Sequence, residues 1–423
     1  MEKKALIPRQ YLLAFILITS MFLAWGIANN MTDTLLAAFK KIMSMSDFQT
    51  TFVQYAFYGA YFCFAIPAAL LIKRFSYKTG VLLGLGMFIG GALLFYPASQ
   101  TMVYGHFLAA LYILAGGLSF LETSANPYIV AMGPEESGTQ RLNLAQSFNP
   151  VGSITGVLLS KFFILSHLNP ATEEERSAMP ADQLATIQAE ELSAVMGPYV
   201  GVAAVLLVLW LMIAFTKMPK ASDDSEAFNF KRSLGRLTRN RNYVMAVVAQ
   251  FFYVGAQICI WSFTIRYVMR ELAVDEEAAS SYYIASLVLF LASRFICTYL
   301  MRYIKPARLL SILAALAIVL TLGAIWGSGT LGVYSLVGIS ACMSLMFPTI
   351  YGLGLKGLGK DTQLGGSGLV MAILGGAVLT GIQGLISDSS GSIKYSFYVP
   401  LVCFLIVSLY GRFAERQSQE VER

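Results

Sequence analysis

The chain has 423 residues, of which 57% are hydrophobic and 13% are charged, and its formal net charge is +6. The charged share is about half that of an ordinary soluble domain, and an excess of Lys and Arg is usual in the cytoplasmic loops of membrane proteins. The composition therefore argues against a soluble enzyme, a disordered chain and a nucleic-acid-binding protein.

Twelve apolar segments follow one another along the chain. Because a membrane-spanning helix needs about 20 predominantly apolar residues, we expect an all-α membrane protein with twelve transmembrane helices. No stretch alternates as the strands of a membrane β-barrel do. The expected segments are 11–36, 51–72, 79–96, 102–128, 142–165, 198–215, 243–269, 279–301, 309–326, 331–355, 365–386 and 395–413.

Basic residues are distributed unevenly between the two sides of this expected bundle. The side that holds both termini carries 22 Lys and Arg residues, and the opposite side carries 6. Since loops rich in Lys and Arg stay on the cytoplasmic side, the sequence predicts that both termini are cytoplasmic.

The longest basic connection divides the segments into two sets of six. The sets resemble each other weakly, for example at 149–156 and 374–381. Two such six-helix repeats are the layout of many secondary transporters. We therefore expect two pseudo-symmetric bundles, over 1–216 and 243–423, joined by a cytoplasmic linker over 217–242.

Residues for enzymatic chemistry are missing from the sequence. The glycine-rich stretch 354–360 fits the first seven positions of a phosphate-binding P-loop, but Asp361 stands where Ser or Thr must reach the magnesium ion. The sequence has no HExxH or GxSxG motif and no cluster of metal ligands. We therefore expect no enzymatic activity, no cofactor and no metal site.

Two acidic residues lie inside expected spanning segments, where an ionisable group is costly and is a functional candidate by default. Asp33 lies in the first segment and Glu122 in the fourth. A carboxylate in a low-dielectric environment can exchange a proton near neutral pH, which a proton-coupling residue must do. The alternatives are an outward-facing helix end for Asp33 and a helix-packing role for Glu122.

Neutral amides accompany these acids. Asn30 precedes Asp33 by three residues, and Gln146 precedes Asn149 by three, so each pair shares one helix face. Amides offer both donors and acceptors, which suits recognition of hydroxyl groups without charge. The alternative is that they join helices by hydrogen bonds, as amides in membrane bundles often do.

In the second half, the expected seventh and tenth segments carry aromatic residues and no acid. Aromatic rings stack on the apolar face of a sugar while amides and carboxylates bind its hydroxyl groups. A polar first-half wall facing an aromatic second-half wall therefore predicts a sugar cavity, although helix packing is an alternative use of such rings. Further candidates for sugar contact are Trp25, Gln257, Trp261 and Tyr351.

Two arginines, Arg266 and Arg294, also fall inside second-half segments. We expect the long side chain of Arg266 to reach the outer interface. For Arg294 a gating ion pair and a structural role are both open, and we favour the structural role.

Three motifs in the first half resemble a known family. WGIANNMTD at 25–33, FLETSANPYIVAMG at 120–133 and RLNLAQSFNPVGSITG at 141–156 are similar to signatures of the fucose–galactose–glucose proton symporters of the major facilitator superfamily. The resemblance implies the major facilitator fold and proton coupling by the acids at 33 and 122. It also implies sugar contacts from the amides at 30, 146 and 149 and from the acid at 122.

The function implied by this resemblance is secondary active transport by alternating access. We expect a monomer in the bacterial inner membrane that imports L-fucose, or a closely related hexose or 6-deoxyhexose, with protons. Its partners are then the sugar, protons and the lipid bilayer, with no nucleic acid. The alternatives are a glucose/galactose porter coupled to protons or sodium and, more remotely, a transporter-like sugar sensor.

Overall fold

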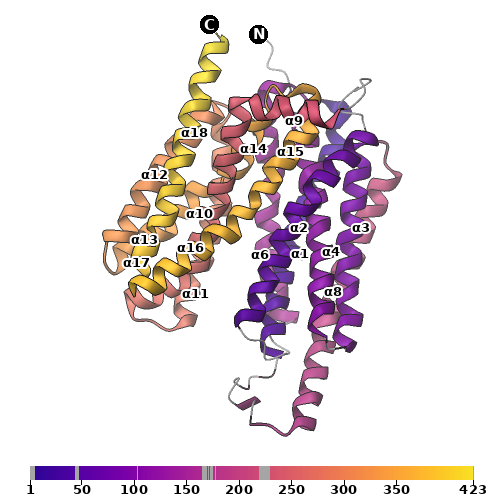
Figure 1. Ribbon diagram of the computed structural model, residues 1–423, viewed down its shortest axis with the longest axis vertical. Coiled ribbons are helices and arrows are strands. Elements are labelled where there is room, and N and C mark those ends of the chain that lie inside the picture. Colours follow the sequence, from indigo (N-terminus) through magenta and orange to yellow (C-terminus); the bar gives the residue numbers. More distant parts are fainter. Residues whose placement is uncertain are drawn as a thin grey trace.

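The long apolar segments fold into helices throughout the part of the chain that the structure describes (Figure 1). The computed structural model describes residues 5–42, 47–101, 103–163, 169, 171, 175–176, 178–218 and 229–422, and these contain no β-strand. Two groups of helices lie side by side, and both termini lie at the same end of the molecule (Figure 1).

The first group comprises the helices up to residue 215. They are α1 (Leu12–Ile42), α2 (Asp47–Arg74), α3 (Tyr77–Thr101), α4 (Tyr104–Ala131), α5 (Gly138–Gln146), α6 (Phe148–Phe163) and α8 (Ala181–Phe215). Short 3₁₀ turns, η1 (Arg9–Tyr11) and η2 (Glu135–Ser137), precede α1 and α5.

The second group begins at residue 230. Its helices are α9 (Phe230–Arg239), α10 (Arg241–Leu272), α11 (Glu276–Leu300), α12 (Pro306–Trp326), α13 (Thr330–Met343), α14 (Met346–Leu355), α15 (Thr362–Met371), α16 (Gly375–Ser390), α17 (Ile393–Ser396) and α18 (Tyr398–Glu422). The 3₁₀ turns η4 (Gly359–Asp361) and η5 (Ala372–Leu374) flank α15.

Eleven helical stretches in the described ranges are long and apolar enough to cross a membrane. The expected fifth segment is instead divided at Ser147 into α5, with 9 residues, and α6, with 16 residues. Neither piece alone reaches spanning length, but together they follow the course expected for the fifth helix. Large apolar side chains such as Phe215, 85% exposed, and Leu385, 71% exposed, cover the outside, as expected for a surface that faces lipid.

Glycines allow the helices that carry the candidate residues to approach closely. A Cβ on Gly26 of α1 would lie 2.2 Å from the backbone oxygen of Asn149 in α6. In the second group, a Cβ on Gly375 at the start of α16 would lie 2.0 Å from the backbone oxygen of Phe251 in α10. Small residues at such crossings let membrane helices pack backbone to backbone.

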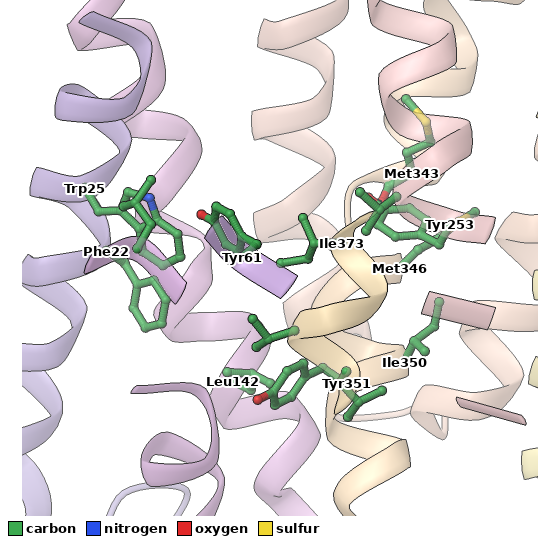
Figure 2. Close-up of a cluster of buried hydrophobic side chains, with 14 of the residues drawn as sticks. Phe22, Trp25, Tyr61, Leu142, Tyr253, Met343, Met346, Ile350, Tyr351 and Ile373 are labelled. Atoms are coloured by element: carbon green, nitrogen blue, oxygen red, sulfur yellow. The ribbon is translucent and has the colours of Figure 1, made fainter. Parts of the chain in front are cut away.

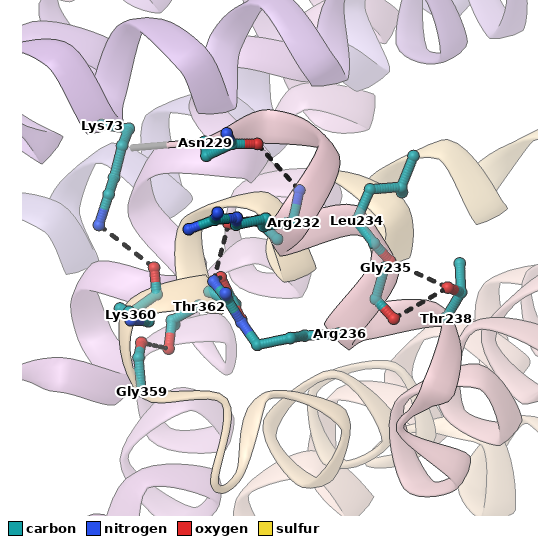
Figure 3. A network of polar contacts seen from close by, with 12 residues as sticks. Lys73, Asn229, Arg232, Leu234, Gly235, Arg236, Thr238, Gly359, Lys360 and Thr362 are labelled. Carbon is teal, nitrogen blue, oxygen red and sulfur yellow. Dashed lines mark hydrogen bonds and ion pairs between the residues drawn. The ribbon is translucent and has the colours of Figure 1, made fainter. Parts of the chain in front are cut away.

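The two groups of helices contact each other near the end that carries the termini. Asn143 of α5 donates from Nδ2 to Thr349 Oγ1 of α14 at 3.1 Å. Lys73, at the end of α2, donates from Nζ to the carbonyl oxygen of Lys360 at 3.2 Å (Figure 3). These contacts join segments more than 200 residues apart and close this end of the molecule.

The short helix α9 lies across the same end (Figure 1). Its Arg236 donates to both carboxylate oxygens of Asp361 at 2.6 and 2.7 Å, which ties α9 to the turn before α15. Part of the linker expected over 217–242 lies outside the described residues, because 219–228 are not described. The C-terminal part of that range forms α9 and the start of α10.

Candidate functional site

A cavity of about 700 Å³ lies between the two groups of helices. Small-molecule sites commonly measure about 300–1,000 Å³. Most of its lining comes from α1, α2, α6, α10 and α11, and α4, α5, α14 and η5 contribute one residue each. The two groups of helices contact each other near the termini. The cavity lies between them on the side of this contact that is farther from the termini.

A hydrogen-bonded row of polar side chains forms one wall of the cavity. Asn126 donates from Nδ2 to the Glu122 carboxylate, and Gln146 donates from Nε2 to Asn126 Oδ1 at 2.8 Å. Glu122 and Gln146 line the cavity and are each 7% exposed, whereas Asn126 is fully buried behind them. The row therefore places one ionisable group and one amide side by side at the cavity surface.

A buried arginine fixes the helix that carries Gln146. Arg141 of α5 is fully buried and donates to the carbonyl oxygens of Ile129, at 2.8 Å, and Val130. These carbonyl groups belong to the C-terminal turn of α4, where backbone hydrogen bonding within a helix is incomplete. Arg141 thus holds α5 against α4, and this position of α5 brings Gln146 to Asn126 of α4.

The two other candidate amides line the cavity next to the contact between α1 and α6. Asn30 donates from Nδ2 to the carbonyl oxygen of Gly26 at 3.2 Å, and Asn149 donates from Nδ2 to the carbonyl oxygen of Phe22 at 3.3 Å. Both side chains are half-buried. Both side chains thus bring an amide, a group that suits hydroxyl recognition, to the cavity surface.

Aromatic side chains line both walls, and not the second-half wall alone. Phe22 and Trp25 of α1 stack with ring centroids 5.7 Å apart, and Figure 2 shows them on the same side as Tyr61 of α2. On the opposite wall, Trp261 and Phe290 pack edge to face at 5.1 Å. A flat polyhydroxylated ligand between these walls would meet rings on its apolar faces and amides on its edges.

Seven of the candidates lie at the cavity, and Tyr351, whose side chain is also described, does not. Asn30, Glu122, Gln146, Asn149, Trp25, Gln257 and Trp261 are among its lining residues. Tyr351 is fully buried and donates from its hydroxyl to the carbonyl oxygen of Gly366 at 3.3 Å, so the structure does not bring it to the cavity. The backbone of Asp33 lies in α1, but its side chain lies outside the described residues.

Sequence reasoning missed one polar contributor, Asn126. Asn126 follows Glu122 by four residues, so the two share a helix face, and this spacing was a signal that could have identified the pair. Arg294, for which the sequence left a gating ion pair and a structural role open, lines the cavity and is 4% exposed.

Comparisons with known proteins agree with this geometry. The sequence matches the family described as Major Facilitator Superfamily over residues 11–376. It is 40% identical over 422 residues to the L-fucose-proton symporter of Haemophilus influenzae, and the match covers 97% of each chain. It is 33% identical over 408 residues to a glucose/galactose transporter of Brucella abortus, with 95% of this chain and 94% of that protein covered.

A solved structure is also similar over most of the chain. It is the crystal structure of a Major Facilitator Superfamily transporter, FucP, in the outward conformation. The TM-score is 0.91 at 39% sequence identity, and the match covers 96% of this chain and 99% of that chain.

Proposed function

Because the chain belongs to the Major Facilitator Superfamily, with the twelve-helix fold of its relatives, we infer that it imports L-fucose together with protons. Like its relatives, it is a transporter and not an enzyme. The observation that carries the substrate assignment is the 40% identity to an L-fucose-proton symporter over nearly the full length of both chains. The cavity supports it, because one carboxyl group, several amides and facing aromatic rings suit a neutral sugar and a proton.

We further propose the orientation and the conformational state. The uneven distribution of basic residues supports a position in the bacterial inner membrane with both termini in the cytoplasm. The contacts near the termini then close the cytoplasmic side, so that the cavity faces outward, as in the similar crystal structure. The two groups of helices act as the N- and C-terminal bundles, over 1–216 and 243–423, that rock about the site. The protein works as a monomer without a cofactor.

The proposed cycle begins in this outward-facing state. Glu122 takes up a proton from the outside, and the sugar binds to Asn30, Gln146 and Asn149. Neutralising the carboxylate lowers the cost of closing the cavity around it, because a buried unpaired charge is expensive. The bundles then open inward and release both cargoes.

The driving force of such a cycle is sufficient for accumulation. One proton moving down a membrane potential of 100 mV releases about 2.3 kcal/mol. That free energy supports a sugar gradient of roughly 50-fold. Asp33 is proposed as a second proton-coupling residue, on the strength of the sequence motif alone.

The experiment is uptake of labelled L-fucose into proteoliposomes under an inward proton gradient. Glu122→Gln and Asp33→Asn are compared with the wild type and with Glu276→Gln, a control at an exposed acid at the start of α11. We expect the wild type and the control to accumulate sugar. We expect the two test variants to lose accumulation, while exchange of sugar survives in at least the Glu122 variant.

Three outcomes would change the proposal. Accumulation of glucose or galactose but not of L-fucose would leave the proposed mechanism unchanged. The substrate would then be the one named for the Brucella abortus relative. Accumulation driven by a sodium gradient and not by protons would replace the coupling ion. If both test variants still concentrate sugar, the two acids are structural and the proposed mechanism is wrong.

A further inference from the structure

Arg294 of α11 is a buried cation without a compensating anion in the described part of the chain. Its side chain is 4% exposed, its buried Nε has no hydrogen-bond partner there, and it belongs to none of the ion pairs of these residues. The guanidinium stacks over the ring of Phe290, 5.0 Å from its centroid. Arginine keeps its charge in proteins, and a buried charge without a partner is strongly destabilising. A buried guanidinium of this kind therefore needs an anion or hydrogen-bond acceptors beside it during the transport cycle.

The side chain of Arg294 lines the cavity, and so does one group of opposite charge. Among the described residues that line the cavity, Glu122 on α4 and Arg294 on α11 carry formal charge, one from each group of helices. The other titratable groups that interact with them are Tyr351 near Glu122, and Tyr253 and Cys297 near Arg294. Tyr and Cys side chains are ordinarily neutral near pH 7. The Glu122 carboxylate is therefore the anion that the described part of the cavity offers to Arg294.

The two side chains do not form an ion pair in this outward-facing arrangement. Glu122 instead accepts the hydrogen bond from Asn126 on its own helix. The two groups of helices are apart on this side, and closing the cavity brings their walls together. We propose that Glu122 and Arg294 form an ion pair across the cavity in the empty, deprotonated carrier, and that a proton and a sugar together replace this pair. The inference rests on the proposed function and adds a residue to its coupling mechanism.

The charges of the proposed pair then decide in which loading states the carrier can close its cavity. With the carboxylate deprotonated and no sugar bound, the ion pair neutralises the two formal charges of the described cavity lining, so the empty carrier can return. With proton and sugar bound, the carboxyl group is neutral, and sugar oxygens accept the hydrogen bonds of the guanidinium. With the proton but no sugar, the guanidinium would be enclosed without a partner. With the sugar but no proton, the sugar would keep the two charges apart, and both would be enclosed without a partner. The proton and the sugar therefore cross the membrane only together.

The test compares two modes of transport in proteoliposomes. Exchange of external for internal sugar uses the loaded carrier alone, whereas net downhill influx also needs the empty carrier to return. The variants are Glu122→Gln, Arg294→Gln, the double variant, and Glu122→Gln combined with Arg266→Gln. Arg266 is the matched control, because it also stacks on an aromatic ring, Phe263 at 4.2 Å, but is exposed and is not among the cavity lining.

We expect Glu122→Gln to exchange sugar but to show net influx slower by at least about tenfold, because the empty carrier encloses an uncompensated guanidinium. Adding Arg294→Gln removes that charge and restores net influx, without proton coupling, whereas adding Arg266→Gln does not. Arg294→Gln alone transports sugar downhill but does not accumulate it.

The pairing is refuted if the double variant is no faster in net influx than Glu122→Gln. It is equally refuted if Arg294→Gln accumulates sugar as the wild type does. Exchange activity reports folding, and if Arg294→Gln abolishes exchange, Arg294→Lys, which keeps the charge, must retain accumulation. Accumulation of L-fucose by the wild type tests the proposed function separately. The variants are therefore assayed with whichever of L-fucose, glucose or galactose the wild type carries.

Discussion

Replacing Gly156 by alanine should damage the sugar site although no candidate sugar-binding residue is substituted. Gly156 lies in α6 where that helix crosses α1. A Cβ there would lie 2.5 Å from the backbone oxygen of Ile27 and 3.2 Å from Cβ of Asn30. The first distance is about 0.9 Å shorter than the 3.4 Å at which ordinary contact begins. Because the obstructing atom belongs to the backbone, α1 and α6 must move apart.

The size of the effect follows from this displacement. Overpacking of this kind costs about 1–3 kcal/mol of stability. A shift approaching 1 Å takes hydrogen bonds from Asn30 out of their usual range of about 2.7–3.2 Å. Each neutral hydrogen bond contributes about 1 kcal/mol. Losing one or two should therefore weaken sugar binding by between about 5-fold and 30-fold.

The sequence repeat supplies a matched control at Gly381, which corresponds to Gly156 in the second half. A Cβ at Gly381 would meet nothing within 4 Å. Alanine is also the better helix former, by about 1 kcal/mol. Gly381→Ala should therefore melt at an equal or higher temperature and bind sugar as the wild type does. L-fucose binding by titration calorimetry and thermal unfolding in detergent decide the matter, and equal sugar affinity of the two variants would refute the reasoning.

Two other substitutions test the polar row and the closed end. Asn126→Ala removes the donor to Glu122 and the acceptor from Gln146, and unsatisfied buried groups cost about 1–3 kcal/mol each, so we expect sugar affinity to fall at least about tenfold. Unchanged affinity in the same titration would contradict a role for the row. A Cβ at Gly352 would lie 2.7 Å from Thr139 Oγ1 across the contact between α14 and α5. Gly352→Val should therefore lower the outward-facing population by about tenfold. Sugar binding to sealed right-side-out vesicles should weaken accordingly, and wild-type binding there would show that the wedge is tolerated.

Much of the architecture can be predicted from the sequence because the signals are local. A membrane span needs about 20 apolar residues in a row, and eleven of the twelve expected segments overlap described helical stretches that are long and apolar enough to span. Basic residues next to each span predict the orientation in the same local way. The motif around Glu122 and the Gln146–Asn149 spacing identified three residues that line the cavity, and the motif at 25–33 contains two more, Asn30 and Trp25.

The directions of individual side chains could not be predicted in this way. A helix that is apolar on all sides carries little information about which face it turns toward a cavity. Gln257 and Tyr351 were equally plausible candidates, yet Gln257 lines the cavity whereas Tyr351 donates its hydroxyl to Gly366 within the second group.

The sequence by itself thus determined the class of protein, the course of its helices and the residue types available for a sugar and a proton. The tertiary structure alone decided that Asn126 joins Glu122 to Gln146 and that Arg294 faces the cavity without a partner among the described residues. The physical reason is that helix rotation is set by contacts between distant segments, such as the backbone approach at Gly26 and the arginine cap on α4. Hydropathy reports how apolar a segment is, but it does not report which helix packs against it.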